Sequence, residues 1–499
     1  MTTTTRPAER GVVAAGHPVT AQAGAELLRA GGNAVDAAVA AVLASLVAEP
    51  LLTGLGAGGY LLVAPPDREP VLVDFFVEAP GRGSEPAERA PLLPVEISFG
   101  DAVQVFHVGA ASCGVYGVPA GLAGAAKWYG TAPLAELVAP AIALARDGVL
   151  VNRQQANLFA LLAGIVGSTP EARAHYLTDG RPPREGELRR DPELADALHR
   201  LGAEGAAPFY TGDLATAVAD WVRERGGTLT RDDLAAYRVV RREPIRVGYR
   251  GREVHTNPPP SAGGLLLAFA LTLLAGTPGP PDEAALVSAM RSAQEARTPE
   301  FFDGLAAPGF GDGFLAASRL GSTTHISVLD TDGWACSVTC SNGEGSGLVV
   351  PGTGVHLNNM LGEQDLSPHG FFAHPTGRRL PSMMAPTVVR RHGAAELVLG
   401  SAGSNRIRSA LLQVIVNAVD RGLEAQPAVD APRLHVEDGM VYAEPGIDLD
   451  ALTAAGQPVT RFRAQNLFFG GCQAVERHRR TGALSGGGDP RRGGAAVVV

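Results

Sequence analysis

The fold of this chain is decided by the stretch GSTTHISVLD, residues 321–330. Two threonines and an imidazole lie near its start, an alternating apolar run follows, and a turn rich in aspartate and glycine comes at residues 330–333. A second alternating run begins at Trp334. Two such runs joined by such a turn predict a β-hairpin. Its polar start suits the exposed, rigidly held end of a sheet, where chemistry can take place.

The polar start of this hairpin resembles the start of the small subunit in the γ-glutamyltranspeptidase family. The resemblance rests on Thr323-Thr324-His325 and on SVLD at residues 327–330. Members of this family are N-terminal-nucleophile hydrolases, made as one chain that cuts itself directly before a threonine. The resemblance therefore implies a cut between Ser322 and Thr323, with Thr323 as the catalytic nucleophile.

A freed α-amine on Thr323 would supply the base that its own hydroxyl needs. A threonine hydroxyl is a weak nucleophile without a neighbouring base, and an unperturbed α-amine, with a pKa of about 7.7–8.0, is partly neutral near pH 7. His325 is therefore expected to be a packed strand histidine and not the base. Taken alone, the motif favours a plain polar strand start; the matches elsewhere in the chain reverse that preference.

The composition limits the class of protein. A length of 499 residues allows two domains or one large layered domain. With 45% hydrophobic residues the chain is globular and able to bury a sizeable core. A net charge of −9 argues against a nucleic-acid groove or an anionic membrane surface as partner. The four cysteines contain no CxxC pair, so we expect no metal site, no disulfide framework and no cofactor.

The N-terminal region predicts a pair of helices. Residues 1–10 lack the apolar core of a secretion signal, so we expect a cytoplasmic protein. A first helix is predicted from Pro18, and Asn33 can cap a second helix over residues 34–48. This second run is apolar but shorter than the ~20 residues of a bilayer span. Residues 28–37 are also among the closest matches to the same family.

The run GLGAGG at residues 54–59 satisfies the letters of the dinucleotide fingerprint G-x-G-x-x-G. That fingerprint works only between a strand and a following helix. Here a helix is predicted before the run and a strand, residues 60–63, after it, so we reject the cofactor interpretation. In the family this run lies beside the nucleophile, and we expect it to allow close backbone packing near the site.

The resemblance places Phe76 where family members with glutamyl substrates carry an arginine that binds the α-carboxylate of the substrate. Arg82 is nearby but could take over only if its loop folds back. Met360 and Met383 also replace polar residues of the family pattern. An amino-acid carboxylate buried there without a cation would cost several kcal/mol of desolvation. These departures argue against a glutamyl substrate.

The other candidate site residues come from the C-terminal part of the chain. By resemblance, Ser341 provides the hydroxyl that faces the nucleophile, and Asn342 faces the substrate, although both also suit a plain glycine-rich loop. Asn359 belongs to an Asn-Asn signature of the family. Glu363 is the nearest acid for the α-amine of a substrate, with Asp365 as a second possibility.

Of a family pair of serines, only Ser382 remains. Residues 397–407 read as strand, tight turn and helix, and the N–H groups at such a helix start form an anion site. The resemblance implies that Gly403 and Ser404 form the oxyanion hole, where removal of a donor can cost ~2.7–4 kcal/mol. A phosphate loop is the rival interpretation, but no G-x-x-x-x-G-K-[ST] is present. Residues 486–495 match family C-termini, and we expect a structural role for them.

The resemblance covers residues 11–495 and implies an α+β fold, a four-layer αββα sandwich. Residues 1–322 would form a large subunit and residues 323–499 a small one, together one interlocked domain. The implied activity is that of a self-processing N-terminal threonine hydrolase or acyltransferase acting on a γ-glutamyl or related amide through a covalent acyl-enzyme. The expected partners are a small-molecule acyl donor and a water or amine acceptor, without nucleic acid or membrane; a dimer of the two-chain unit stays open.

Two alternatives remain open on sequence alone. One is a carbon–carbon bond hydrolase or a cephalosporin-acylase-like enzyme of secondary metabolism, which uses the same attack without a glutamate clamp. The other is an uncleaved, inactive homologue that acts as a binding protein. Denaturing electrophoresis separates this last class from the enzymes, because only a self-processing chain gives two bands.

Overall fold

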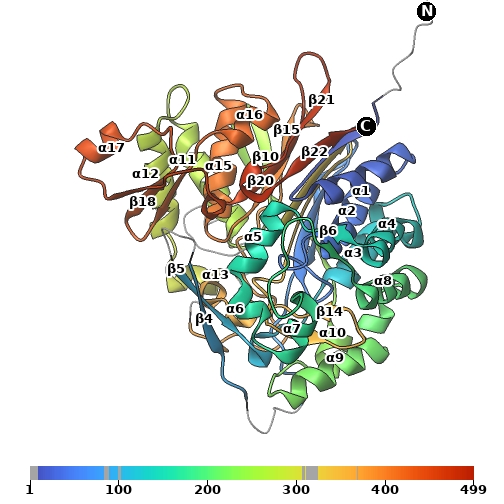
Figure 1. The fold of residues 1–499 in the computed structure, drawn as a ribbon. Helices are drawn as coiled ribbons and strands as arrows, with labels where there is room; N and C mark the ends of the chain where they lie inside the picture. Colours follow the sequence, from blue (N-terminus) through green and yellow to red (C-terminus); the bar gives the residue numbers. More distant parts are fainter. Residues whose placement is uncertain (1–8, 84–88, 99–102, 306–309, 311–323, 368) are drawn as a thin grey trace, which may run out of the picture.

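A computed structural model describes residues 9–83, 89–98, 103–305, 310, 324–367 and 369–499 (Figure 1). The predicted cleavage site, Ser322 and Thr323, lies outside the described residues, as does most of the segment before it. The description of the site therefore begins at Thr324.

Two antiparallel sheets form the centre of the described structure. The first has seven strands, in the order β22 (Ala495–Val498), β1 (Gly11–Ala15), β11 (Thr324–Asp330), β12 (Ala335–Ser341), β2 (Gly58–Ala64), β3 (Val71–Phe75) and β8 (Val240–Arg242). The second has six, in the order β21 (Leu484–Gly487), β20 (Gly471–Arg477), β16 (Ala394–Ala402), β15 (Thr387–Arg391), β10 (Arg252–Thr256) and β9 (Ile245–Tyr249). The hairpin predicted from residues 321–330 is thus confirmed as β11 and β12.

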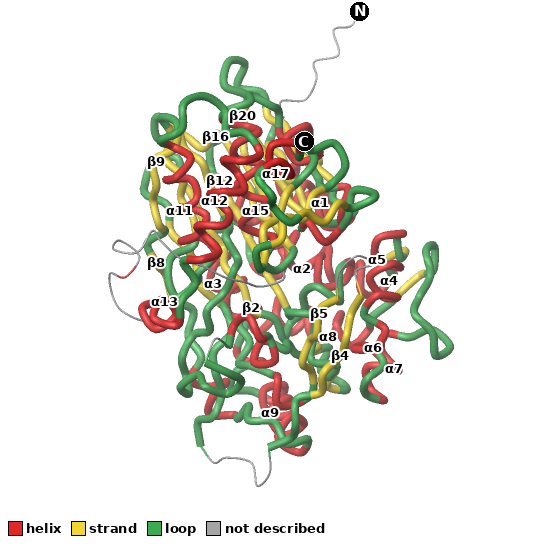
Figure 2. Tube along the Cα trace, turned by 90° about the vertical axis from the view of Figure 1, so that its left-hand side faces the viewer, coloured by secondary structure: helices red, strands yellow, loops and turns green. Residues whose placement is uncertain are grey.

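Helices cover the outer face of each sheet. The first sheet is covered by α1 (Pro18–Arg29), α2 (Ala34–Ala48), α3 (Val118–Tyr129), α4 (Leu134–Asp147) and α8 (Pro192–Glu204). The second is covered by α11 (Gly263–Ala275), α12 (Glu283–Glu295), α15 (Arg406–Val419) and α16 (Ala425–Asp430). In Figure 2, α11, α12 and α15 lie together in the upper part of the molecule. The order helix, sheet, sheet, helix confirms the predicted α+β, four-layer αββα architecture.

Side chains that alternate along the strands build three separate apolar layers. Val13 and Val328 pack against the helices of the first sheet. Val12 and Leu329, each adjacent in sequence to one of these residues, pack between the two sheets. Leu399 packs under the helices of the second sheet. Successive side chains of a strand point to opposite faces, and β11 is buried along its whole length, with Ile326, Val328 and Leu329 as its apolar residues.

The remaining elements lie around this sandwich. They are β4 (Leu93–Ser98), β5 (Val103–Val108), β6 (Val149–Leu150), α5 (Arg153–Leu161), α6 (Ala163–Val166), α7 (Pro170–Tyr176), β7 (Leu188–Arg189), α9 (Asp213–Glu224), α10 (Arg231–Ala236), α13 (Pro299–Gly304), β13 (Val349–Val350), β14 (Val355–His356), β17 (Leu434–Glu437), β18 (Met440–Ala443), α17 (Asp450–Ala454) and β19 (Val459–Arg461).

The predicted N-terminal helix pair is confirmed. Asn33 caps α2: its side-chain oxygen accepts the N–H groups of Val35 (2.9 Å) and Asp36 (3.0 Å), while the Asp36 carboxylate accepts the N–H of Asn33 (2.9 Å). Every residue of α2 is buried, as expected for a helix between layers. Within the described ranges, no helix has both the length and the apolar character that crossing a membrane requires.

Candidate functional site

The first residue of β11, Thr324, lies at a buried junction between the first sheet and the helices α1 and α2. Its Oγ1 donates a hydrogen bond to Oε2 of Glu49 (2.9 Å), and Oγ1 of Thr20 donates to Oε1 of the same carboxylate (2.9 Å). Glu49 follows α2 and is 1% exposed. Gly16 makes room for it, because a Cβ there would lie 2.6 Å from Oε2. The start of the hairpin is therefore held by a buried carboxyl group.

Burial raises the pKa of Glu49 to about 7, because the charged form loses its hydration. The hydrogen bonds from Thr324 and Thr20, and the positive charge of Arg492, act in the opposite direction. The carboxyl group that holds Thr324 thus changes its charge close to neutral pH.

This raised pKa makes stability depend on pH with a definite sign. The folded pKa of about 7 exceeds the ordinary glutamate pKa of 4.5, so the folded state binds the proton more tightly. The stabilisation is complete below pH 4.5 and is lost as the pH rises to 7. Relative to a Glu49→Gln variant, we expect the native protein to lose up to about 3 kcal/mol of unfolding free energy over this window.

Urea unfolding at several pH values between 4.5 and 8 measures this difference. A Glu26→Gln variant, on the exposed side of α1, is the matched control. Parallel curves for the native protein and the Glu49→Gln variant would show that the carboxyl group titrates normally.

Gly403 and Ser404 form the turn between β16 and α15. Both have positive φ, 122° and 59°. Within the part of the chain that the structure describes, neither backbone N–H donates a hydrogen bond, and Oγ of Ser404 is buried without a partner. Adjacent unpaired N–H groups at a helix start are suited to bind an oxygen that gains negative charge.

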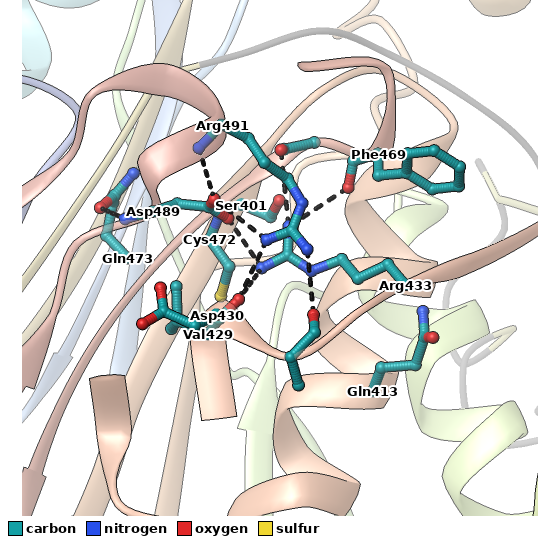
Figure 3. Close-up of polar contacts among 12 residues, drawn as sticks. Ser401, Gln413, Val429, Asp430, Arg433, Phe469, Cys472, Gln473, Asp489 and Arg491 are labelled. Atoms are coloured by element: carbon teal, nitrogen blue, oxygen red, sulfur yellow. Dashed lines mark hydrogen bonds and ion pairs between the residues drawn. The ribbon is translucent and has the colours of Figure 1, made fainter. Parts of the chain in front are cut away.

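A buried ion cluster lies next to the strands that lead to this turn (Figure 3). Asp489 accepts the N–H of Cys472 on β20 (2.8 Å) and pairs with Nη2 of Arg433 (2.7 Å) and Nη1 of Arg491 (3.2 Å). Cys472 in turn pairs with Ser401 of β16, two residues before Gly403. The C-terminal segment thus has the structural role predicted for residues 486–495.

Arg492, the next residue after this cluster, is a site residue that the sequence analysis missed. Its side chain packs on Gly471, and its Nη2 would lie 3.5 Å from a Cβ at Gly403. Its Nε is buried and has no hydrogen-bond partner among the described residues. Burial lowers its pKa to about 10, with Arg406 adding to the effect, so Arg492 is still a cation at neutral pH. The sequence analysis missed Arg492 because it directly follows Arg491 and no local sequence pattern distinguishes the two arginines.

Ser341 and Asn342 lie where β12 ends. Thr324 pairs with Cys340 in the register, so Ser341 is the next residue along β12 past the described end of β11. Oγ of Ser341 accepts the N–H of Gly343 (2.8 Å). Oδ1 of Asn342 is buried and has no partner in the described ranges, which leaves one acceptor for a ligand.

Asn359 and Glu363 are brought against the same loop. Nδ2 of Asn359 donates to Oε1 of Glu363 (3.0 Å), and Oδ1 of Asn359 accepts the N–H of Glu344 (3.1 Å). Gly343, with φ of 64°, lies on both side chains: a Cβ there would be 2.1 Å from Oδ1 of Asn359 and 2.8 Å from Oε1 of Glu363. The structure therefore joins these two predicted site segments.

Phe76 is buried and stacks on Tyr60, with 5.3 Å between ring centroids. It shares an apolar cluster with Met360. Met383 belongs to the cluster of α11 and α15. Its backbone lies close to Gly263 at the start of α11, where a Cβ would be 2.0 Å from its carbonyl oxygen. A more apolar acyl pocket formed by Phe76, Met360 and Met383 stays a prediction.

The cations close to Phe76 are already paired. Arg82 pairs with Asp233 (3.4 Å) and with Glu78 (3.8 Å). Arg379 pairs with Glu78 (3.3 Å) and donates to the carbonyl oxygen of Phe76. Whether Arg82 replaces the arginine that the family pattern places at residue 76 stays untested, but in this structure its guanidinium is bound to two carboxylates.

Ser382 is fixed by its own loop. Its Oγ accepts the N–H of Met384 (3.1 Å), and its carbonyl oxygen accepts the N–H of Gly263 (3.0 Å). No contact between Ser382 and the other predicted site residues is found within the described ranges, so its place in the site stays a prediction. The same holds for Asp365, whose side chain is not described.

His325 is confirmed as a packed strand histidine. Its Nδ1 contacts Oγ1 of Thr339 (2.7 Å) and its Nε2 contacts Oγ of Ser327 (2.9 Å). Burial lowers its pKa to about 3, so it is neutral. The glycine run at residues 54–59 also packs as expected, because a Cβ at Gly56 would lie 2.2 Å from the carbonyl oxygen of His356.

Comparisons with known proteins add to this geometry. The family described as Gamma-glutamyltranspeptidase matches residues 20–307 and 293–499. The acylase ACY 1 proenzyme of Pseudomonas sp. (strain SE83) is 33% identical, over 98% of this chain and 94% of that protein. The glutathione hydrolase proenzyme of Escherichia coli (strain K12) is 32% identical, over 97% and 91%. The crystal structure of cephalosporin acylase from Bacillus halodurans superposes with a TM-score of 0.83 at 28% identity, over 100% of this chain and 98% of that one.

Proposed function

Because the chain belongs to the gamma-glutamyltranspeptidase family, we propose that it is a self-processing N-terminal threonine hydrolase or acyltransferase with Thr323 as nucleophile. The relatives, glutathione hydrolases and acylases, make it an enzyme of the N-terminal-nucleophile hydrolase type. The observation that carries the proposal is the pair of N–H groups at Gly403 and Ser404, which have no hydrogen-bond partner among the described residues. Arg492 lies beside this turn and acts on Glu49, which holds Thr324.

In the proposed reaction, the α-amine of Thr323 takes the proton of its own hydroxyl while Oγ attacks the carbonyl carbon of an amide. The carbonyl oxygen becomes negative and is stabilised by the N–H groups of Gly403 and Ser404. The amine half leaves with the proton, and the acyl group stays on Oγ as an ester. Water or an amine then attacks this ester by the same steps in reverse order and frees the threonine.

Self-processing uses the same attack by Oγ of Thr323, but not the α-amine as base, because before the cut this nitrogen is still part of the peptide bond. Oγ attacks the carbonyl carbon of Ser322, the C–N bond breaks, and the hydroxyl proton passes to the nitrogen, which leaves an ester and a free α-amine. Water then hydrolyses the ester and frees both chains. The proposed cut gives residues 1–322 and 323–499. In the first sheet, β11 and β12 lie between β1 and β2. We therefore expect the two products to stay together as one unit that shares both its sheet and its core.

For the substrate, we propose an acylase-type amide with an uncharged acyl group. Two features support this: Phe76 fills its position with a ring stacked on Tyr60, and Arg82 and Arg379 are bound to carboxylates. Similarity to an acylase proenzyme and to a cephalosporin acylase points the same way. A free glutamyl carboxylate would have no unpaired cation among the described residues next to Phe76.

A comparison of two anilides tests this substrate class. We expect slow or absent turnover of γ-glutamyl-p-nitroanilide and at least about tenfold higher kcat/KM for the neutral pentanoyl-p-nitroanilide, because an unpaired buried carboxylate costs several kcal/mol and 1.4 kcal/mol is about tenfold. Release of p-nitroaniline measures both, with a Thr323→Ala variant as background. Fast release from the γ-glutamyl compound with a low KM would show that another residue binds the carboxylate.

A further inference from the structure

The carboxyl group of Glu49 joins both sides of the proposed cut. Thr20 and Gly16, which contact it, come from the part before residue 322, as does Glu49 itself. Among the described residues after the cut, Thr324 is the one that forms a hydrogen bond with this carboxylate. A hydrogen bond across 275 residues of sequence thus fixes the point where the chain enters β11.

The hydrogen bonds favour the ionised form of this group. Both carboxylate oxygens accept a threonine hydroxyl, whereas a protonated acid would have to donate one of these bonds and would leave a hydroxyl without its acceptor. Arg492 adds a positive charge that favours the carboxylate.

The other charged groups near this pair lie around Arg492. Arg406, Asp489 and Glu344 act on its guanidinium. His17, which follows Gly16, is uncharged near neutral pH because burial lowers its pKa to about 4. Arg492 is therefore the charge that acts directly on Glu49.

An ionised carboxylate at this depth reduces stability, and a neutral side chain of the same shape would not. Groups that keep an unfavourable charge in a buried place are concentrated at functional sites. Here the Glu49 carboxylate contacts Thr324, the residue that directly follows the proposed nucleophile Thr323.

We propose that Glu49 is a positioning residue for the reaction, whose carboxylate holds Thr324 at the start of β11. This inference rests on the function proposed for Thr323. It predicts that the reaction needs two deprotonated groups, the α-amine of Thr323 and the carboxyl of Glu49.

The first-turnover release of p-nitrophenolate from p-nitrophenyl acetate, measured between pH 5 and 9, tests this. Acetylation of Thr323 needs only a small acyl group, and a Thr323→Ala variant gives the background. For the native protein we expect the logarithm of the rate to rise with a slope of about two below pH 6.5, because both groups must lose a proton. Glu49→Gln and Thr324→Val should each give a slope of about one and a rate roughly tenfold to a hundredfold lower at the pH optimum.

Two further variants and a control make the test specific. The double variant Glu49→Gln/Thr324→Val should be no slower than the slower single variant, because both remove the same hydrogen bond. Arg492→Gln should keep the slope of two but move the acid limb to higher pH. Glu26→Gln should behave like the native protein.

The outcomes separate this inference from the proposed function. A native protein that stays one chain, or a Thr323→Ala variant that keeps the burst, overturns the function. Normal two-chain protein with a slope of two in Glu49→Gln, or additive losses in the double variant, overturns only the role of Glu49. If Glu49→Gln does not fold, the slope of Thr324→Val decides.

Discussion

Replacing Thr323 with alanine is expected to leave the purified protein as one chain of 51.4 kDa, whereas the native protein gives two. The variant keeps the peptide bond but loses the hydroxyl that attacks it. Loss of this hydroxyl should also lower the catalytic activity by several orders of magnitude. In a serine hydrolase, loss of the nucleophile lowers kcat by a factor of about 10⁶. Denaturing electrophoresis and N-terminal sequencing of the shorter chain measure the cut, and anilide turnover measures activity.

Ser322→Ala is the matched control for this experiment. It changes the side chain on the other side of the same peptide bond and keeps the carbonyl group that is attacked, so it should still give two chains. A native protein that runs as a single band would favour a binding protein over an enzyme. A fully active protein with no chain that starts at Thr323 would end the proposal.

Asp489→Asn is expected to destabilise the protein by about 3–5 kcal/mol. This substitution keeps the shape of the side chain but removes the charge between Arg433 and Arg491, both of which are buried. Arg491 keeps its ion pair with Glu444, but Arg433 loses the one ionic partner that it has among the described residues, which leaves its charge uncompensated in a poorly hydrated place. Because Asp489 also accepts the N–H of Cys472, next to the strand that leads to Gly403, activity should fall as well.

Asp67→Asn is the control for this second experiment. Asp67 pairs with Arg68 at the surface (3.4 Å), and its side chain is 70% exposed. Exposed pairs contribute about 0–1 kcal/mol, so urea unfolding should show little change. Equal unfolding free energies for the two variants would mean that the cluster of Arg433, Asp489 and Arg491 contributes no more to stability than an exposed ion pair.

Local patterns were sufficient to predict several single elements, while the four-layer architecture followed from the family resemblance. The alternation at residues 321–330 predicts β11, and the cap at Asn33 predicts the start of α2, because each depends on neighbours within a few residues. The rejection of a nucleotide loop at residues 54–59 also needed only the order of the flanking elements. Motif resemblance located Gly403 and Ser404 at a turn whose N–H groups are unpaired in the described structure.

The sequence by itself determined single elements such as β11 and the start of α2, since periodicity, caps and turns depend on adjacent residues. Its resemblance to a known family supplied the layered α+β fold and the segments that contribute to the site. Only the tertiary structure decided that Glu49 holds Thr324, that Arg492 stands beside Gly403, and that Arg82 is bound to Asp233. These contacts join residues far apart in the chain. They depend on side-chain direction and on the cost of burying charge, which no local pattern records.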